Sequence, residues 1–331
     1  MKNSDDAQNT NLHWSQQKEQ AVGYWQIKLL LILFRLFPII ILRILAFPVG
    51  FFYFLFSKKA RTESKRFLKK AAPFVNDPVM AKKCRSPLGP LRHIISFSLT
   101  VVGKIESWGG KLQLNKFTYQ DGDIFGLRGD LESGKGVFLI TSHLGTVELL
   151  RGLASFNRIS VSLKVPFTAV LDTNVTRNFT RMMRELNPDF VDIIGVNEIG
   201  PDTAILLEER LAAGGIVTIA ADRTDANRAE KNLLIPFLGE EAPFSSGVFY
   251  MAALMKAPVY FMFAMRRGDL SIRPEYDVYV HKSTLPLECS RKERFQKSAD
   301  LAAAFAALLE SYCKERPFQW YNFYDFWSKE V

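Results

Sequence analysis

Cysteine and histidine are scarce in this chain, and their scarcity limits the kinds of site that it can build. Three cysteines are present, Cys84, Cys289 and Cys313, and they lie far apart with no Cys-x-x-Cys pair. This pattern predicts neither a disulfide framework nor a zinc site, and it is typical of thiols in a reducing compartment. With only four histidines, a histidine-rich metal centre is not expected either.

Other signatures are missing as well. No secretory signal is recognised, because the first apolar run begins late and lacks a small-residue cleavage site. No complete Gly-rich nucleotide-binding loop is present. The aromatic stretch 318–327 contains no Lys or Arg, so it does not resemble a base-stacking surface for nucleic acid. Core packing or a membrane-interface belt is the expected role of these aromatic side chains.

The composition that remains is basic and apolar. The 331 residues carry a formal net charge of +9, and 48% of them are hydrophobic, which is enough for a sizeable core. A basic balance favours an anionic partner. Composition alone leaves three classes of partner open: nucleic acid, a membrane surface, and an acidic protein or substrate.

A long apolar stretch, 29–56, is followed directly by a basic one, 58–70. The apolar stretch is longer than the roughly 20 residues that a helix needs to cross a bilayer. However, Arg35 and Arg43 interrupt it, and their spacing places them close together on a helix, which suits a helix in the membrane interface. A spanning helix, an interfacial or re-entrant anchor, and a buried soluble helix all stay open. The basic run predicts that the following chain lies on the cytoplasmic side, near anionic lipid, with a solvated basic helix face as the alternative.

The chain is expected to divide into four parts. These are a mobile polar tail at 1–28, a membrane anchor at 29–57, a basic juxtamembrane connector at 58–90, and a folded domain at 91–331. Within that domain, predicted helices alternate with predicted buried strands. This alternation predicts an α/β fold with a layered mixed sheet flanked by helices. A short strand is expected within 117–131, ahead of the main motif.

That motif is a buried strand that ends in a polar turn containing His143. Glu148 follows five positions later, in the first turn of a predicted helix, from which its carboxylate can reach back to the imidazole. A histidine held by a carboxylate is a general-base arrangement. Gly145 permits a tight turn and a close approach of substrate. From the spacing alone, a structural histidine at a strand end stays equally open.

Two further groups of polar residues are candidates. Asp222 and Arg223 follow the predicted buried strand 216–221, where they form either part of a site or an ordinary surface ion pair. Three arginines share one face of a predicted helix, either for contact with an anionic substrate or as a solvated face. They are Arg177, Arg181 and Arg184.

These blocks, in this order, resemble the bacterial lipid A acyltransferase family of the glycerolipid acyltransferase superfamily. Ser142 to Leu149 resembles the superfamily's His-x4-Asp/Glu block. Ala221-Asp222-Arg223 is similar to a second block, and Pro236-Phe237-Leu238-Gly239 to a third. The chain departs from the common lipid A form, which has Asn-Trp where Thr146-Val147 stand and Gln where Arg223 stands. These departures leave the acceptor open.

The resemblance implies transfer of a fatty acyl group from an acyl thioester to a hydroxyl of a lipid or glycolipid. His143 would be the general base and Glu148 would orient it. Arg223 or backbone N–H groups near Gly145 would bind the oxyanion, and Asp222 would help to hold the site. Acyl-carrier protein, or else acyl-CoA, would be the donor, with no metal and no bound cofactor.

The location implied is the cytoplasmic face of a bacterial inner membrane, with the membrane as a partner and no nucleic acid. Two functions of other classes compete with this hypothesis. One is a non-catalytic membrane-bound scaffold, in which His143 has no chemical role. The other is a membrane-associated glycosyltransferase, because basic α/β domains with an anchor also bind nucleotide sugars.

Overall fold

A computed structural model of the chain describes most of the residues that follow the N-terminal tail. The described residues are 29, 32–34, 36–108, 114–120, 123–146, 165–171, 192–196, 200–224, 232–285 and 290–328. The predicted tail, 1–28, lies outside them.

Helices come first in the described chain, and strands and helices alternate after them. The helices are α3 (Ile39–Phe56), α4 (Lys58–Ala71), α5 (Pro78–Arg85), α6 (Gly89–Trp108), α7 (Asp123–Glu132), α10 (Pro201–Ala212), α11 (Ser246–Met255) and α12 (Arg294–Glu315), with short 3-10 helices η2 (Leu114–Lys116) and η5 (Pro317–Gln319). The strands are β1 (Phe117–Tyr119), β2 (Val137–Thr141), β3 (Phe167–Leu171), β4 (Asp192–Gly195), β5 (Ile216–Ala220), β6 (Asn232–Phe237), β7 (Glu240–Ser245), β8 (Val259–Arg266) and β9 (Tyr276–Lys282).

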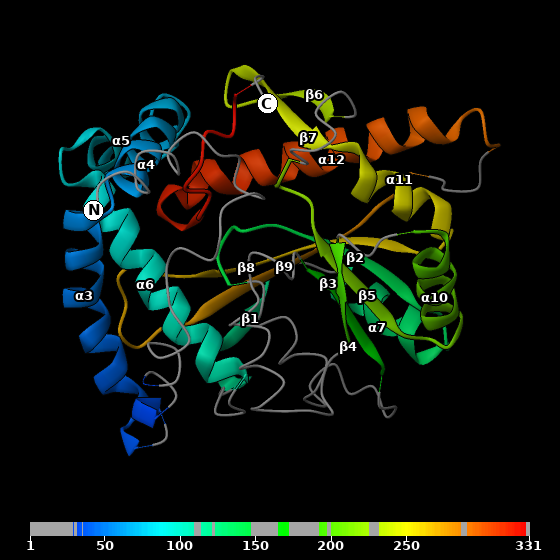
Figure 1. Cartoon of the computed structure of the whole chain (residues 1–331), viewed down its shortest axis with the longest axis horizontal. Helices are drawn as coiled ribbons and strands as arrows, with labels where there is room; N and C mark the ends of the chain where they lie inside the picture. Colours follow the sequence, from blue (N-terminus) through cyan, green and yellow to red (C-terminus); the bar gives the residue numbers. More distant parts are fainter. Residues whose placement is uncertain are drawn as a thin grey trace, which may run out of the picture.

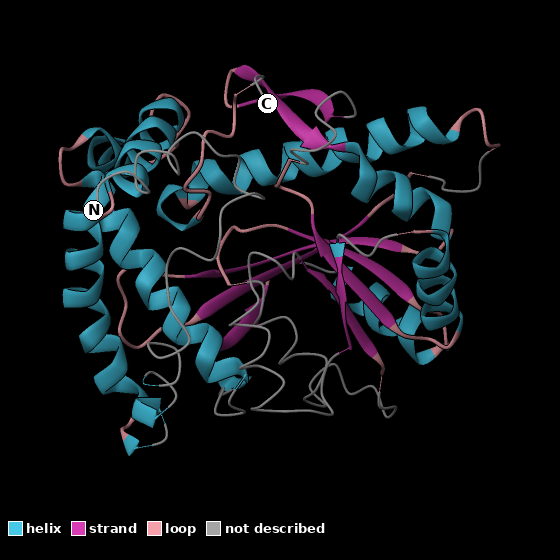
Figure 2. Ribbon diagram, in the orientation of Figure 1, coloured by secondary structure: helices cyan, strands magenta, loops and turns pink. Residues whose placement is uncertain are grey.

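A seven-stranded mixed sheet forms the centre, in the order β1-β9-β8-β2-β5-β3-β4 (Figures 1 and 2). Strand β8 pairs antiparallel with β9 and parallel with β2, and the β2-β5-β3-β4 half is parallel throughout. Strands β6 and β7 form a separate antiparallel hairpin. The α/β class, with a layered mixed sheet flanked by helices, is therefore confirmed.

Both faces of the sheet are buried, which explains why its central strands β2, β5 and β8 are mostly apolar. In β2, Phe138 and Ile140 face the larger core, which includes residues of α10, α11 and α12. Val137 and Leu139 face the opposite core, into which α7 packs. A strand that is buried on both sides reads as a continuous hydrophobic run rather than as an alternating one.

Helix α3 lies against α6 at one end of the molecule (Figure 1). A Cβ on Gly50 would come within 2.9 Å of the Ser98 side chain on α6, so glycine allows the two helices to approach closely. Arg43 points inward, where it forms an ion pair with Glu106 of α6. Helix α3 is the one described helix that is long and apolar enough to cross a membrane.

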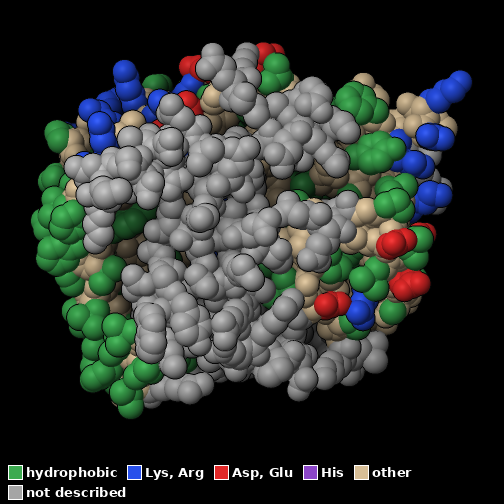
Figure 3. All heavy atoms as spheres, in the orientation of Figure 1, with side chains coloured by type: hydrophobic (Ala, Val, Ile, Leu, Met, Phe, Trp, Pro, Cys, Tyr) green, Lys and Arg blue, Asp and Glu red, His purple; other side chains and the backbone are tan. Residues whose placement is uncertain are grey.

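The opposite face of α3 is exposed and apolar. Its most exposed large side chains include Ile44, Val49, Phe52 and Phe56, at 53%, 62%, 55% and 83%. Figure 3 shows hydrophobic side chains gathered along this edge, with Lys and Arg side chains near α4 and α5 beside them.

One expectation from the sequence needs correction, and another is confirmed. Residues 58–90 are not a connector: they form α4 and α5, and Phe67, Leu68 and Cys84 belong to the same core as the sheet. The short strand expected within 117–131 is β1 (Phe117–Tyr119), and α7 follows it. The buried Ile124, Leu127 and Leu131 of α7 follow helical spacing.

Candidate active site

The sheet register brings His143 and Asp222 together. Neighbouring strands β2 and β5 run parallel, with Thr141 opposite Ala220. His143 and Asp222 each lie two positions beyond that pair, at the carboxyl ends of the two strands. Asp222 Oδ1 lies 2.8 Å from His143 Nδ1, and Asp222 Oδ2 accepts the backbone N–H of His143 at 2.7 Å. Two residues 79 apart in sequence thus form a bidentate contact.

Asp222 is fully buried, and several donors compensate its negative charge. Besides His143, the indole Nε1 of Trp320 donates to Oδ2 at 2.8 Å, and Nδ2 of Asn322 donates to Oδ2 at 3.4 Å. Burial by itself raises the pKa of a carboxyl. The electrostatic interaction with His143 and the hydrogen bonds from His143 and Trp320 outweigh it, and the pKa of Asp222 lies below its ordinary value.

An ionised Asp222 requires a proton on Nδ1 of His143, which leaves the lone pair on Nε2. Within the described residues, Nε2 has no hydrogen-bond partner, and the side chain is 33% exposed. Burial lowers the pKa of His143, the nearby charge of Arg223 lowers it further, and Asp222 only partly offsets these effects. The imidazole is therefore neutral at pH 7 and able to accept a proton.

Gly145 holds the backbone next to His143 between two neighbours. Its φ of 73° lies in the left-handed region, and a Cβ would come within 2.0 Å of the Ala264 carbonyl oxygen on β8. Its N–H donates to the Gln319 carbonyl at 2.7 Å. The structure thus explains why glycine stands at position 145 by the close packing of its backbone against β8. The sequence had suggested that this glycine allows close approach of substrate.

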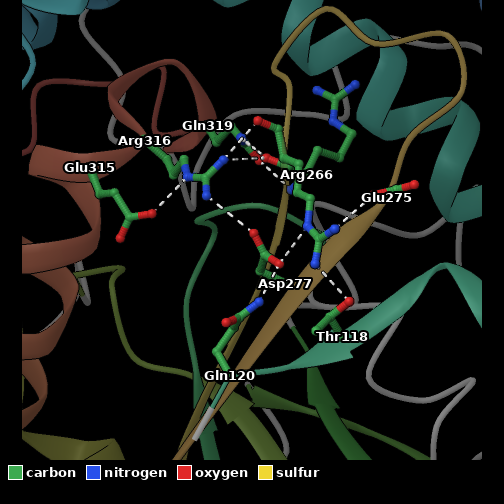
Figure 4. Close-up of polar contacts among 9 residues, drawn as sticks. Thr118, Gln120, Arg266, Glu275, Asp277, Glu315, Arg316 and Gln319 are labelled. Carbon is green, nitrogen blue, oxygen red and sulfur yellow. Dashed lines mark hydrogen bonds and ion pairs between the residues drawn. The ribbon is translucent and has the colours of Figure 1, made fainter.

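The segment that carries Gln319 is itself fixed to the end of β8. The Gln319 side chain accepts from the N–H of Arg266 at 2.9 Å and donates to its carbonyl at 2.7 Å (Figure 4). Arg316 donates to Asp277 and to the Arg267 carbonyl. These contacts place the aromatic C-terminal segment against the turn that contains His143.

The residues proposed from sequence fall into two groups. His143, Gly145, Asp222 and Arg223 come together at the ends of β2 and β5. The other four lie outside the described residues, so their roles stay predictions: Glu148, Arg177, Arg181 and Arg184.

Within the site, the position that the sequence assigned to Glu148 is occupied by Asp222, which accepts from Nδ1 of His143. Arg223 lies over the ring of Tyr324, 5.5 Å from its centroid. Ser142 is fully buried, and its Oγ accepts from the N–H of Leu144 at 3.2 Å, in agreement with a structural role.

Sequence reasoning missed Trp320 and Asn322. Both belong to the aromatic segment, which was expected to be core or membrane belt. Phe318, Trp320 and Phe326 are indeed buried core residues. A buried tryptophan needs an acceptor for its N–H, and this rule was the available signal that the segment contacts a polar group.

Among the described residues, no group of three or more His, Cys, Asp and Glu side chains is arranged to hold a metal ion. Comparison with models of known protein families found no match. Comparison with curated proteins also found no match.

Proposed function

We propose that the protein is an acyltransferase that moves a fatty acyl group from a thioester to a hydroxyl of a lipid or glycolipid. The observation that carries the proposal is the His143–Asp222 pair, with its neutral imidazole, a lone pair on Nε2 and a His143 side chain that is partly exposed. The order of the sequence blocks, which resembles the lipid A acyltransferase family, supports the choice of acyl transfer among base-catalysed reactions.

In this mechanism Nε2 of His143 accepts the proton of the acceptor hydroxyl as its oxygen attacks the thioester carbonyl carbon. Asp222 holds the ring and stabilises the imidazolium that forms. The tetrahedral intermediate then collapses, the C–S bond breaks, and the departing thiolate takes the proton from His143. Backbone N–H groups or Arg223 are the candidate donors to the oxyanion.

Direct transfer, without an acyl-enzyme, fits the surroundings of the two described cysteines and of Ser142. Cys84 and Cys313 are buried, and burial raises the pKa of the Cys84 thiol to about 12. Ser142 is buried, and its Oγ accepts from the backbone N–H of Leu144. None of these groups is placed as a nucleophile.

The donor proposed is acyl-carrier protein, with acyl-CoA as the alternative. Arg177, Arg181 and Arg184 are the predicted contacts for its acidic or phosphate groups. No metal and no bound cofactor take part in the proposed reaction.

For location, we propose the cytoplasmic face of a bacterial inner membrane. The exposed apolar face of α3 and the adjacent exposed lysines of α4, Lys58, Lys65 and Lys69, support contact with an anionic lipid surface. The buried Arg43–Glu106 pair supports an α3 that lies in the interface, because one face of the helix is already committed to α6.

The test is transfer of radiolabelled acyl groups by the purified full chain. The protein in detergent receives labelled acyl-carrier protein or acyl-CoA together with a bacterial lipid extract. We expect label in the lipid fraction and a loss of about 10²- to 10⁴-fold in rate for His143→Ala, the usual contribution of a general base. His281→Gln is the matched control, because His281 lies on β9 against Tyr312.

Two outcomes would overturn the proposal. Incorporation of label from a sugar nucleotide, with acyl thioester ignored, would favour a glycosyltransferase. A protein that binds vesicles but transfers neither group would favour a scaffold.

A further inference from the structure

The C-terminal aromatic segment reaches the proposed base through one side chain. Trp320 is fully buried, and its indole N–H donates at 2.8 Å to Oδ2 of Asp222. The other oxygen of that carboxylate faces Nδ1 of His143. An indole has a single polar group, so this bond determines how the ring and the carboxylate are oriented toward each other.

The contact has the character of a strong hydrogen bond. Its acceptor is an ionised carboxylate with no exposed surface, and such charge-assisted bonds are shorter and stronger than neutral ones. The bond also lowers the pKa of Asp222. Without it, Oδ2 would keep the His143 backbone N–H and the longer contact to Asn322.

The ring of Trp320 is held on several sides by other aromatic rings. The centroids of Phe67, Phe237 and Phe326 lie 4.8, 5.3 and 5.0 Å from it, all in edge-to-face geometry. Phe67 comes from α4 and Phe237 from β6, so distant parts of the chain surround one indole. Such packing leaves the ring little freedom to rotate.

The backbone of Trp320 is also anchored. His93 Nε2 lies 2.9 Å from the Trp320 carbonyl oxygen, and His93 Nδ1 lies 3.0 Å from Ser64 Oγ on α4. Burial lowers the pKa of His93 to about 3, so the ring is neutral and donates from Nε2 to the carbonyl. A continuous set of hydrogen bonds therefore runs from α4 through His93 and Trp320 to Asp222.

We infer that Trp320 is a positioning residue, which fixes the Asp222 carboxylate so that Oδ1 faces Nδ1 of His143. It touches no reacting atom and acts through Asp222 alone. The inference rests on the proposed function for its effect on rate, but its effect on the titration of His143 is independent of any substrate.

The experiment removes the indole N–H of Trp320 and keeps the shape of its ring. Trp320 is substituted by β-(3-benzothienyl)alanine, in which sulfur replaces the indole N–H, and by phenylalanine in Trp320→Phe. Trp327→Phe is the matched control, because the Trp327 indole belongs to the same segment and donates to the Phe237 carbonyl instead. Two quantities are measured: acyl-transfer rate against pH, and the pKa of His143 by NMR of labelled histidine.

For the Trp320 analogue we expect kcat to fall about 10- to 100-fold, as for the loss of one hydrogen bond to a charged group. We also expect the acid limb of the rate–pH profile and the NMR titration of His143 to move to higher pH. The reason is that removing a donor from the ionised carboxylate raises the pKa of the coupled His143–Asp222 pair. The Trp327 variant should show neither change.

A kcat and titration equal to those of the Trp327 variant would overturn the inference. So would an equal loss of rate at every pH with an unchanged titration, which is the mark of a packing defect. If the wild-type chain transfers no acyl group, the proposed function fails, and the NMR titration still decides the role of Trp320.

Discussion

Arg43 and Glu106 form an ion pair buried between α3 and α6, with only 4% and 3% of their side chains exposed. Arg43 also donates to the Ile272 carbonyl, beyond the end of β8. The arginine that interrupts the apolar stretch is thus an internal structural residue, held by a partner 63 positions away.

Removing one member of this pair should be costly. We expect Glu106→Gln to lower the free energy of unfolding by about 3–5 kcal/mol, because it leaves a buried charge uncompensated. The double variant Arg43→Met/Glu106→Leu should lose less unfolding free energy than the single variant Glu106→Gln. Denaturant unfolding in mild detergent measures both, and a single variant no less stable than the double would contradict the burial of the pair.

Both ends of α3 should lie on the same side of the membrane. We expect cysteines introduced at Leu36 and Lys58, in a background without native cysteines, to react with an impermeant maleimide added to one side of sealed inner-membrane vesicles. Both positions are exposed, Leu36 just before α3 and Lys58 just after it. Phe295→Cys, on the exposed surface of α12, reports the side of the folded domain. Labelling of Leu36 and Lys58 from opposite sides would establish a spanning helix instead.

Gly145 should tolerate no side chain. We expect Gly145→Ala to destabilise the protein by more than the roughly 1–2 kcal/mol of left-handed backbone strain, because the new Cβ also collides with β8. Gly129→Ala is the control: nothing lies within 4 Å of its Cβ, and alanine in α7 should stabilise by about 0.5–1 kcal/mol. Thermal unfolding compares them, and equal stability of the two variants would argue against the close approach.

His93 should make stability depend on acid pH. Its pKa is about 3 in the folded protein and 6.5 ordinarily, so only the unfolded chain takes up this proton between those values. The contribution of the neutral His93 ring to the free energy of unfolding is complete above pH 6.5. It falls by about 1.4 kcal/mol per pH unit as the pH drops toward 3. We expect the difference in unfolding free energy between wild type and His93→Gln to narrow along that range. A constant difference would show that His93 is charged in the folded protein.

Local patterns in the sequence were sufficient for many elements. Buried strands were expected before His143 and at 216–221, where β2 and β5 lie. His143 and Asp222 were each recognised as polar residues at strand ends. Their contact was not recognised, because it depends on β2 and β5 being neighbours, and strand order is a property of the whole sheet.

Glu148 was preferred as the carboxylate partner of His143 because strand order could not be read from local patterns. Spacing along the chain reveals partners that are near in sequence, whereas Asp222 reaches His143 through sheet register. The contacts of Trp320 and the inward turn of Arg43 are also long-range. Composition showed that aromatic and basic residues were present but could not show which groups they would meet.

The most direct test of the proposed mechanism is the pH dependence of acyl transfer by wild type and Asp222→Asn. In wild type we expect an acid limb below pH 6.5, since the pKa of His143 is lowered. Asp222→Asn should fold and bind membranes but lose about 10²- to 10⁴-fold in kcat, because an amide no longer selects the tautomer with its lone pair on Nε2. A wild-type rate and acid limb in the folded Asp222→Asn variant would contradict the His143–Asp222 base.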